Sequence, residues 1–164
     1  RQRQMCIRDS RDTWGTNLYQ QINWWAPVSN VEEKNTMIFY PDYFDVPVKN
    51  TTSTWDLNIY LANRKKGDFS YPSAPQLKED LPSNIKKIPV TIKPGEILCF
   101  SGAHLHSSSK EKSENTRISF EIRTICENDL NSSAQAPNVD CDLQWKFPKI
   151  FKKINDNSPL KITS

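Results

Sequence analysis

The side chains of this chain that could do chemistry gather in one stretch of about thirty residues. Both histidines, His104 and His106, lie there, and Arg117 follows His106 by 11 residues, with Ser119 two residues further on. The guanidinium of arginine is a planar fork that matches a carboxylate with two parallel hydrogen bonds. An arginine and a serine beside a histidine pair therefore indicate a site for an anionic ligand.

Short strands must position these side chains. Pro94-Gly95 is turn chemistry, and the apolar residues 97–100 that follow predict a core strand in which Cys99 is a buried thiol. Residues 116–124 alternate strictly between apolar and polar. The apolar face carries Ile118, Phe120 and Ile122, and the polar face carries Arg117, Ser119, Glu121 and Arg123. The polar face either meets solvent or lines the inside of a β-barrel that holds the anion.

The order Gly95-Glu96, His106, Arg117 and Ser119 resembles the C-terminal half of an iron(II)/2-oxoglutarate-dependent oxygenase. It is most similar to the phytanoyl-CoA dioxygenase-like branch. In that family an arginine that follows the distal iron-ligand histidine binds the far carboxylate of 2-oxoglutarate. The resemblance covers residues 11–125 and implies His106 as the distal ligand, with His104 as the alternative. It also implies that Arg117 and Ser119 bind 2-oxoglutarate.

Arg11-Asp12-Thr13-Trp14 is similar to the end of the His-x-Asp iron motif of the same family, which implies Asp12 as a metal ligand. The position of the first histidine holds Ser10, so only Asp12 and His106 remain of a triad of two imidazoles and one carboxylate. Residues 1–10 are basic, lack a strand or helix period and do not begin with Met. We expect them to be a foreign segment that replaced a real histidine and the N-terminal part of the domain. The alternative is a natural pseudo-enzyme.

Residues 17–26 predict a long strand in which Gln21 and Asn23 share a face. Buried amide groups need hydrogen-bond partners. One interpretation is that Gln21 and Asn23 point into the barrel and donate hydrogen bonds to 2-oxoglutarate or to the substrate. The other is an ordinary amphipathic strand, with Trp24 packed in the core and Pro27 ending the strand.

The expected architecture is an all-β core, a double-stranded β-helix or jelly-roll of two antiparallel sheets, with a short helix and irregular loops. Ser53 is expected to cap that helix, which would end near Asn63 and bury Trp55, Ile59 and Ala62. Pro89 predicts an edge strand. Residues 11–126 would form the core, incomplete at its N-terminus, and residues 127–164 an extension that packs on it. The six expected strands are residues 18–26, 36–40, 88–92, 97–101, 104–107 and 117–124.

Composition argues against several classes of protein. A net charge of +3 with scattered lysines and arginines does not favour nucleic acid, and no apolar run approaches the length of a membrane span. The four cysteines lack the spacing of a zinc cluster, and the expected location is the cytoplasm. The basic run Arg64-Lys65-Lys66 predicts a solvated loop or, as the sharper alternative, a contact with coenzyme A or phosphate.

The resemblance implies a non-haem iron dioxygenase that uses Fe(II), 2-oxoglutarate and molecular oxygen to hydroxylate a small organic substrate. Asp12 and His106 would be its catalytic metal ligands. Two other classes stay open. One is a catalytically inactive jelly-roll or cupin-like binding module, and the other is a structural domain in which the spacing of Arg117 and Ser119 is coincidental.

Overall fold

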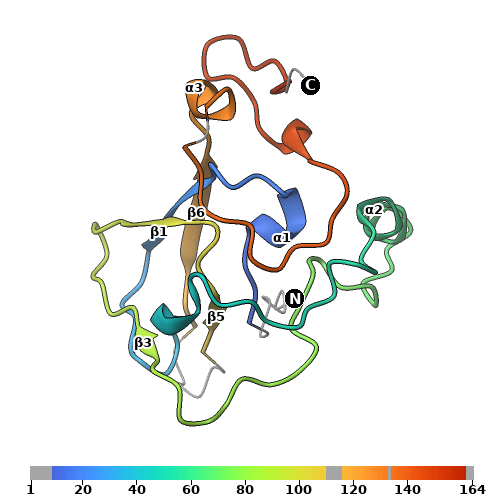
Figure 1. Ribbon diagram of the computed structural model, residues 1–164. Coiled ribbons are helices and arrows are strands. Elements are labelled where there is room, and N and C mark those ends of the chain that lie inside the picture. The colour runs from blue at the N-terminus through green and yellow to red at the C-terminus, as the bar shows by residue number, and fades with distance from the viewer. Residues whose placement is uncertain (1–8, 110–115, 133, 162–164) are drawn as a thin grey trace.

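The computed structural model describes residues 9–109, 116–132 and 134–161. Within them, six strands form two small antiparallel sheets with the strand orders β4-β1-β6 and β3-β2-β5 (Figure 1). The strands are β1 Ile22–Pro27, β2 Met37–Phe39, β3 Ile88–Pro89, β4 Leu98–Ser101, β5 His106–Ser108 and β6 Ser119–Thr124. The helices are α1 Thr13–Thr16, α2 Leu57–Lys65 and α3 Glu127–Leu130, with 3-10 turns η1 Pro41–Tyr43 and η2 Pro148–Ile150. The expectation of a β-rich fold with little helix is confirmed.

The first sheet has β1 at its centre, where Asn23 pairs with Phe100 of β4 and with Arg123 of β6. Successive side chains of a strand point to opposite faces of its sheet. Asn23, Trp25 and Phe100 are buried on one face, and Trp24 of β1 is on the other, 39% exposed. The prediction that Trp24 packs in the core is therefore wrong, because its neighbour Trp25 takes that place.

The outer face of this sheet is apolar and exposed. Cys99 and Ile122 pair with Trp24 from the two sides, and Phe120 lies two residues from Ile122. Cys99 is exposed, so the prediction of a buried thiol is wrong. The run 97–100 is apolar on both faces of the strand, and only one of its faces is covered. The other face of β6 carries Glu121 and Arg123, whose side chains are 25% and 38% exposed.

The second sheet has β2 at its centre, and Pro89 lies on its edge strand β3 as expected. On the other side, β5 pairs Phe39 with His106. Ser10 then pairs with His106 from beyond β5, through hydrogen bonds from Ser10 N to His106 O (2.9 Å) and from His106 N to Ser10 O (3.1 Å). Residue 10 therefore extends this sheet by one antiparallel pair.

Helix α2 begins one turn later than expected. Asp56, and not Ser53, is its N-cap, and the Asp56 carboxylate accepts hydrogen bonds from the backbone N–H groups of Asn58 and Ile59. Trp55 is buried but precedes the helix, and Ile59 and Ala62 are exposed. The predicted buried face is wrong because this helix lies at the side of the molecule, away from both sheets (Figure 1).

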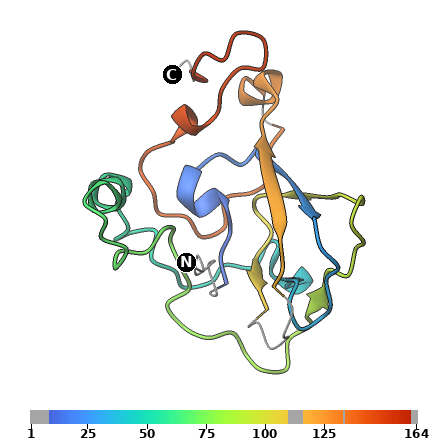
Figure 2. The same ribbon diagram turned by 180° about the vertical axis from the view of Figure 1, so that it is seen from behind.

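The C-terminal part of the chain returns to the N-terminal part. Cys141 and Leu143 pack in one cluster with Trp14 and Leu105, and Phe151 and Leu160 pack against Leu18. In both views the segment after residue 141 passes between α1 and α2 (Figures 1 and 2). Among the described residues, none of the helices has the length and apolar character that crossing a membrane requires.

Candidate functional site

A cavity with a volume of about 420 Å³ is lined by residues of both sheets. Trp25 and Arg123 come from the first sheet, and Met37 and His106 come from the second. The residues singled out by sequence meet there, because Asp12, His106 and Arg117 all belong to its lining. Charged side chains of both signs therefore line one pocket that is open to solvent.

Asp12 and His106 face each other in this cavity. His106 Nε2 lies 3.6 Å from Asp12 Oδ2, and both side chains are almost fully buried. His106 Nδ1 lies 2.9 Å from the carbonyl oxygen of His104. A carbonyl only accepts hydrogen bonds, so Nδ1 carries a hydrogen, and in the neutral ring the lone pair of Nε2 faces the Asp12 carboxylate. Two acceptors that face each other in this way could share a metal cation as ligands.

Two further side chains hold the Asp12 carboxylate. Arg123 Nη2 donates a hydrogen bond to Asp12 Oδ1 at 2.9 Å, and Asn23 Nδ2 donates one to Asp12 Oδ2. Gln21 Nε2 donates to Asn23 Oδ1 at 2.8 Å, and Thr16 Oγ1 donates to Gln21 Oε1 at 3.3 Å. The predicted amide pair is thus buried and hydrogen-bonded in a row that ends on Asp12, and neither amide belongs to the cavity lining.

Ser10 lies beside His106. Residues directly opposite in an antiparallel pair project their side chains to the same face of the sheet, and Ser10 also lines the cavity. A histidine at position 10 would therefore have its ring next to that of His106. Within the described ranges, no three His, Cys, Asp or Glu side chains lie together so that they could hold a metal.

Arg117 lies at another part of the cavity lining. Its Nη2 donates to Ser108 Oγ at 3.1 Å, and its guanidinium carbon lies 6.0 Å from the centre of the Trp25 ring. Ser108 is two residues beyond His106 on β5, which is about 7 Å along a strand. Ser119, which the sequence also assigned to this anion site, is half-buried and is not part of the cavity lining.

His104 occupies a different environment from His106. It precedes β5, and its ring packs on Phe44 (4.5 Å between centroids) and on the edge of Phe39 (5.7 Å). Burial lowers the pKa of His104, so its ring is neutral near pH 7. Of the two histidines, only His106 lines the cavity with Asp12.

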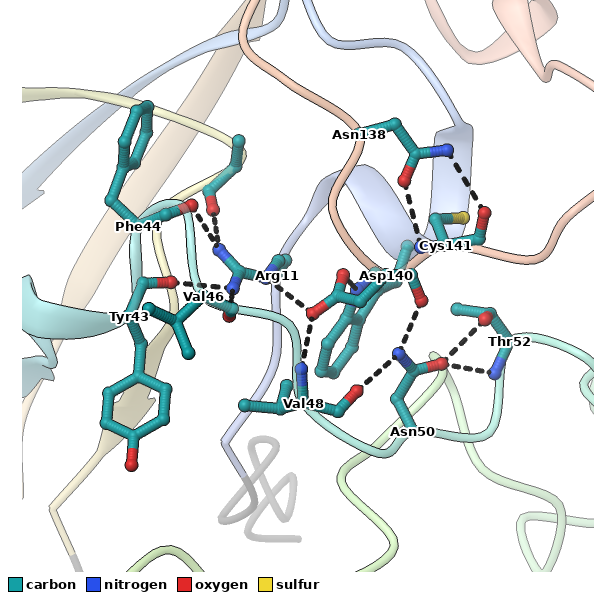
Figure 3. Close-up of polar contacts among 12 residues, drawn as sticks. Arg11, Tyr43, Phe44, Val46, Val48, Asn50, Thr52, Asn138, Asp140 and Cys141 are labelled. Carbon is teal, nitrogen blue, oxygen red and sulfur yellow. Dashed lines mark hydrogen bonds and ion pairs between the residues drawn. The ribbon is translucent and has the colours of Figure 1, made fainter.

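Arg11 fixes the chain between Ser10 and Asp12 (Figure 3). Its side chain is 2% exposed, and its Nε donates to Asp140 Oδ2 at 3.1 Å. Its Nη groups donate to four backbone carbonyls, those of Tyr43, Phe44, Val46 and Ala103. Burial lowers the pKa of Arg11, and the Asp140 carboxylate opposes this change.

The sequence offered no signal for this buried pair, because Arg11 and Asp140 are 129 residues apart. Arg123 was placed on the correct strand face by alternation, but its contact with Asp12 was not foreseen. Comparisons with known proteins add no assignment, since no family model and no curated protein matches the chain.

Proposed function

We propose that this chain is the core of an Fe(II)- and 2-oxoglutarate-dependent oxygenase that hydroxylates a small organic substrate, and that its two sheets are those of a double-stranded β-helix. The observation that carries the proposal is the pair of facing acceptors, Asp12 Oδ2 and His106 Nε2, 3.6 Å apart inside a cavity that also holds Arg117. An imidazole whose other nitrogen donates to a carbonyl is the usual arrangement of a metal-binding histidine.

The donor set fits a divalent metal in part. Asp12 and His106 would be two of the three ligands in a facial triad, and a histidine at position 10, which pairs with His106 and lines the cavity, would be the third. A serine hydroxyl is a poor ligand for Fe(II), so the chain with Ser10 is expected to bind the metal weakly. The bound metal would supply the activation of molecular oxygen, coupled to decarboxylation of 2-oxoglutarate.

The other residues would bind and orient. Arg117 would bind the far carboxylate of 2-oxoglutarate as a bidentate partner, with Ser119 as the second predicted contact. His106 and Ser108 are about 7 Å apart along β5, and Ser108 Oγ accepts a hydrogen bond from Arg117. This separation suits a five-carbon dicarboxylate that would extend from a metal on His106 to Arg117. Gln21, Asn23 and Arg123 would orient the Asp12 carboxylate. This role for Gln21 and Asn23 replaces the direct hydrogen bonds to 2-oxoglutarate that the sequence predicted for them.

A binding module without oxygenase activity is the second candidate function. It is favoured by Ser10, which leaves only two metal-binding side chains of the predicted triad. Such a module would bind an anion through Arg117 and would not depend on Asp12 and His106.

An anaerobic titration with Fe(II) and 2-oxoglutarate tests the proposal. The chelate of a 2-oxo acid with Fe(II) gives a weak visible charge-transfer band, and we would compare the chain as it stands with Ser10→His. Ser10→Asn is the matched control, because it adds a polar side chain of similar reach that is a poor ligand. We expect the band to be strongest in Ser10→His. If Ser10→His is folded and shows no band, the oxygenase assignment fails, and the binding module gains support.

A further inference from the structure

We propose that the apolar part of the cavity lining, formed by Trp55, Leu57, Phe147 and Ile150, binds an uncharged, predominantly apolar substrate. The inference deepens the proposed function, and the term substrate rests on it. We call these four residues the apolar wall. Ser73 and Ala74 also line the cavity, and they follow Pro72, whose carbonyl oxygen accepts a hydrogen bond from Trp55. None of these six residues is charged.

The charged residues of the cavity lining are Arg11, Asp12, Arg117, Glu121 and Arg123, and the Arg11 guanidinium is hydrogen-bonded to Asp140 and to backbone carbonyls. Asp12, Glu121 and Arg123 form one hydrogen-bonded group, with Arg123 Nε donating to Glu121 Oε1 at 2.7 Å and Arg123 Nη2 donating to Asp12 Oδ1. Arg117 lies beside Ser108 and Trp25. A charged group on the substrate would lose its hydration against the apolar wall without gaining a partner there. An apolar group would instead gain free energy from removing its surface from water.

The apolar wall joins two distant segments of the chain through aromatic contacts. Trp55 lies before α2, and its ring centroid is 6.3 Å from the ring centroid of Trp145. The ring centroids of Trp145 and Phe147, both in the C-terminal segment, are 6.2 Å apart. Trp55 is also fixed by a hydrogen bond from its Nε1 to the carbonyl oxygen of Pro72 (2.9 Å). Two of the four wall residues are therefore held in place without a ligand, as is usual for small-molecule sites.

The apolar wall is also held close to Asp12. Phe147 N donates to Thr16 O at 2.9 Å, and Asn17 Nδ2 donates to Trp145 O at 3.1 Å. Thr16 and Asn17 end the short helix α1, which begins directly after Asp12. The segment that carries Phe147 passes between α1 and α2 (Figure 2). A substrate resting on the apolar wall would thus present its carbon skeleton to the centre formed by Asp12 and His106.

Three probes that differ only in one end group test this inference. They are 4-phenylbutan-1-ol, 4-phenylbutanoate and 4-phenylbutylammonium, and their dissociation constants would be measured by ligand-observed NMR on the whole chain without metal. In the Arg117→Ala variant, which lacks the proposed anion site, we expect the alcohol to bind about tenfold more tightly than either ion. Binding of the carboxylate or the ammonium as tight as that of the alcohol in this variant would overturn the inference, because an apolar wall gives no partner to a charged group.

Two variants locate the binding. Leu57→Asp puts a charge on the apolar wall at the first residue of α2, where an acidic side chain is compatible with the helix. Leu61→Asp makes the same change at an exposed residue of the same helix outside the cavity, and is the matched control. Phe147→Ala removes an aromatic ring of the wall, and Phe69→Ala removes an exposed ring elsewhere.

We expect Leu57→Asp and Phe147→Ala to weaken binding of the alcohol about tenfold, and both controls to leave it unchanged. Equal affinities in Leu57→Asp and Leu61→Asp would overturn the inference, even if Phe147→Ala failed to fold. Because these measurements need no metal, failure of the iron titration would leave an apolar small-molecule site standing. Failure of probe binding would leave the iron site untouched.

Discussion

Replacing Arg11 by Met should remove much of the stability of this protein. The Arg11 guanidinium donates to four carbonyls and to the Asp140 carboxylate, whose side chain is 5% exposed. Breaking a buried ion pair by removing one partner costs about 3–5 kcal/mol, because the other charge stays buried. Asp140 keeps hydrogen bonds from Trp14 Nε1 (2.7 Å) and Val48 N (3.1 Å), which limits that part of the loss. The buried carbonyl of Ala103 accepts no other hydrogen bond from the described residues, so we expect a loss of about 3–5 kcal/mol.

Urea denaturation at pH 7 measures this loss as a change in the free energy of unfolding with an unchanged m-value. Arg64→Met is the matched control, because Arg64 lies on exposed α2 and its guanidinium carbon is 4.5 Å from the centre of the Phe69 ring. The control should cost less than about 1 kcal/mol. In a double-mutant cycle, Arg11→Met and Asp140→Asn should be coupled by about 1.5–3 kcal/mol. A loss below about 1 kcal/mol for Arg11→Met would refute the reasoning.

The remaining predictions concern the cavity and the titrating groups. Arg117→Ala should weaken 2-oxoglutarate binding more than a hundredfold and Fe(II) binding much less, in equilibrium titrations of each ligand, and equal losses would contradict the assignment. In the Ser10→His background, His106→Ala should abolish Fe(II) binding and His104→Ala should retain it, as measured by the same titrations. The opposite result would move the ligand role to His104. Because burial lowers the pKa of His104, the unfolded chain binds more protons than the folded protein near and below pH 6.5. The free energy of unfolding should therefore fall as the pH drops below 6.5. In urea denaturation, the His104→Phe variant should show a shallower fall between pH 7.5 and pH 5 than the unchanged chain. Cys99 is exposed on β4 and should react with a thiol reagent in the native protein. Cys141 should not react, because it is buried and burial raises its pKa. Peptide mapping of the labelled chain measures the labelling of each cysteine, and equal labelling would contradict the prediction.

Strand positions were predicted within a few residues because short alternating or apolar runs bounded by Gly and Pro leave little choice of local structure. The same local reasoning failed where burial depends on what lies above a face. Trp24 and Cys99 belong to apolar runs, yet their face of the sheet is exposed. Helix α2 likewise forms, but it buries none of its residues, since helix periodicity does not say whether a partner is present.

The sequence by itself predicted that Ser119, Glu121 and Arg123 share one face of a strand, and β6 contains all three. Arg117, predicted on the same face, lies before β6, and Asp12 and His106 were selected only through the resemblance to an oxygenase family. The period of a strand and the chemistry of side chains are local properties, so they can be deduced without the fold. Only the tertiary structure decided that Ser10 pairs with His106, that Asn23 and Arg123 hold Asp12, and that Phe147 lines the same cavity. These contacts join residues far apart in the chain, and their distances follow from how the two sheets and the returning C-terminal segment pack together.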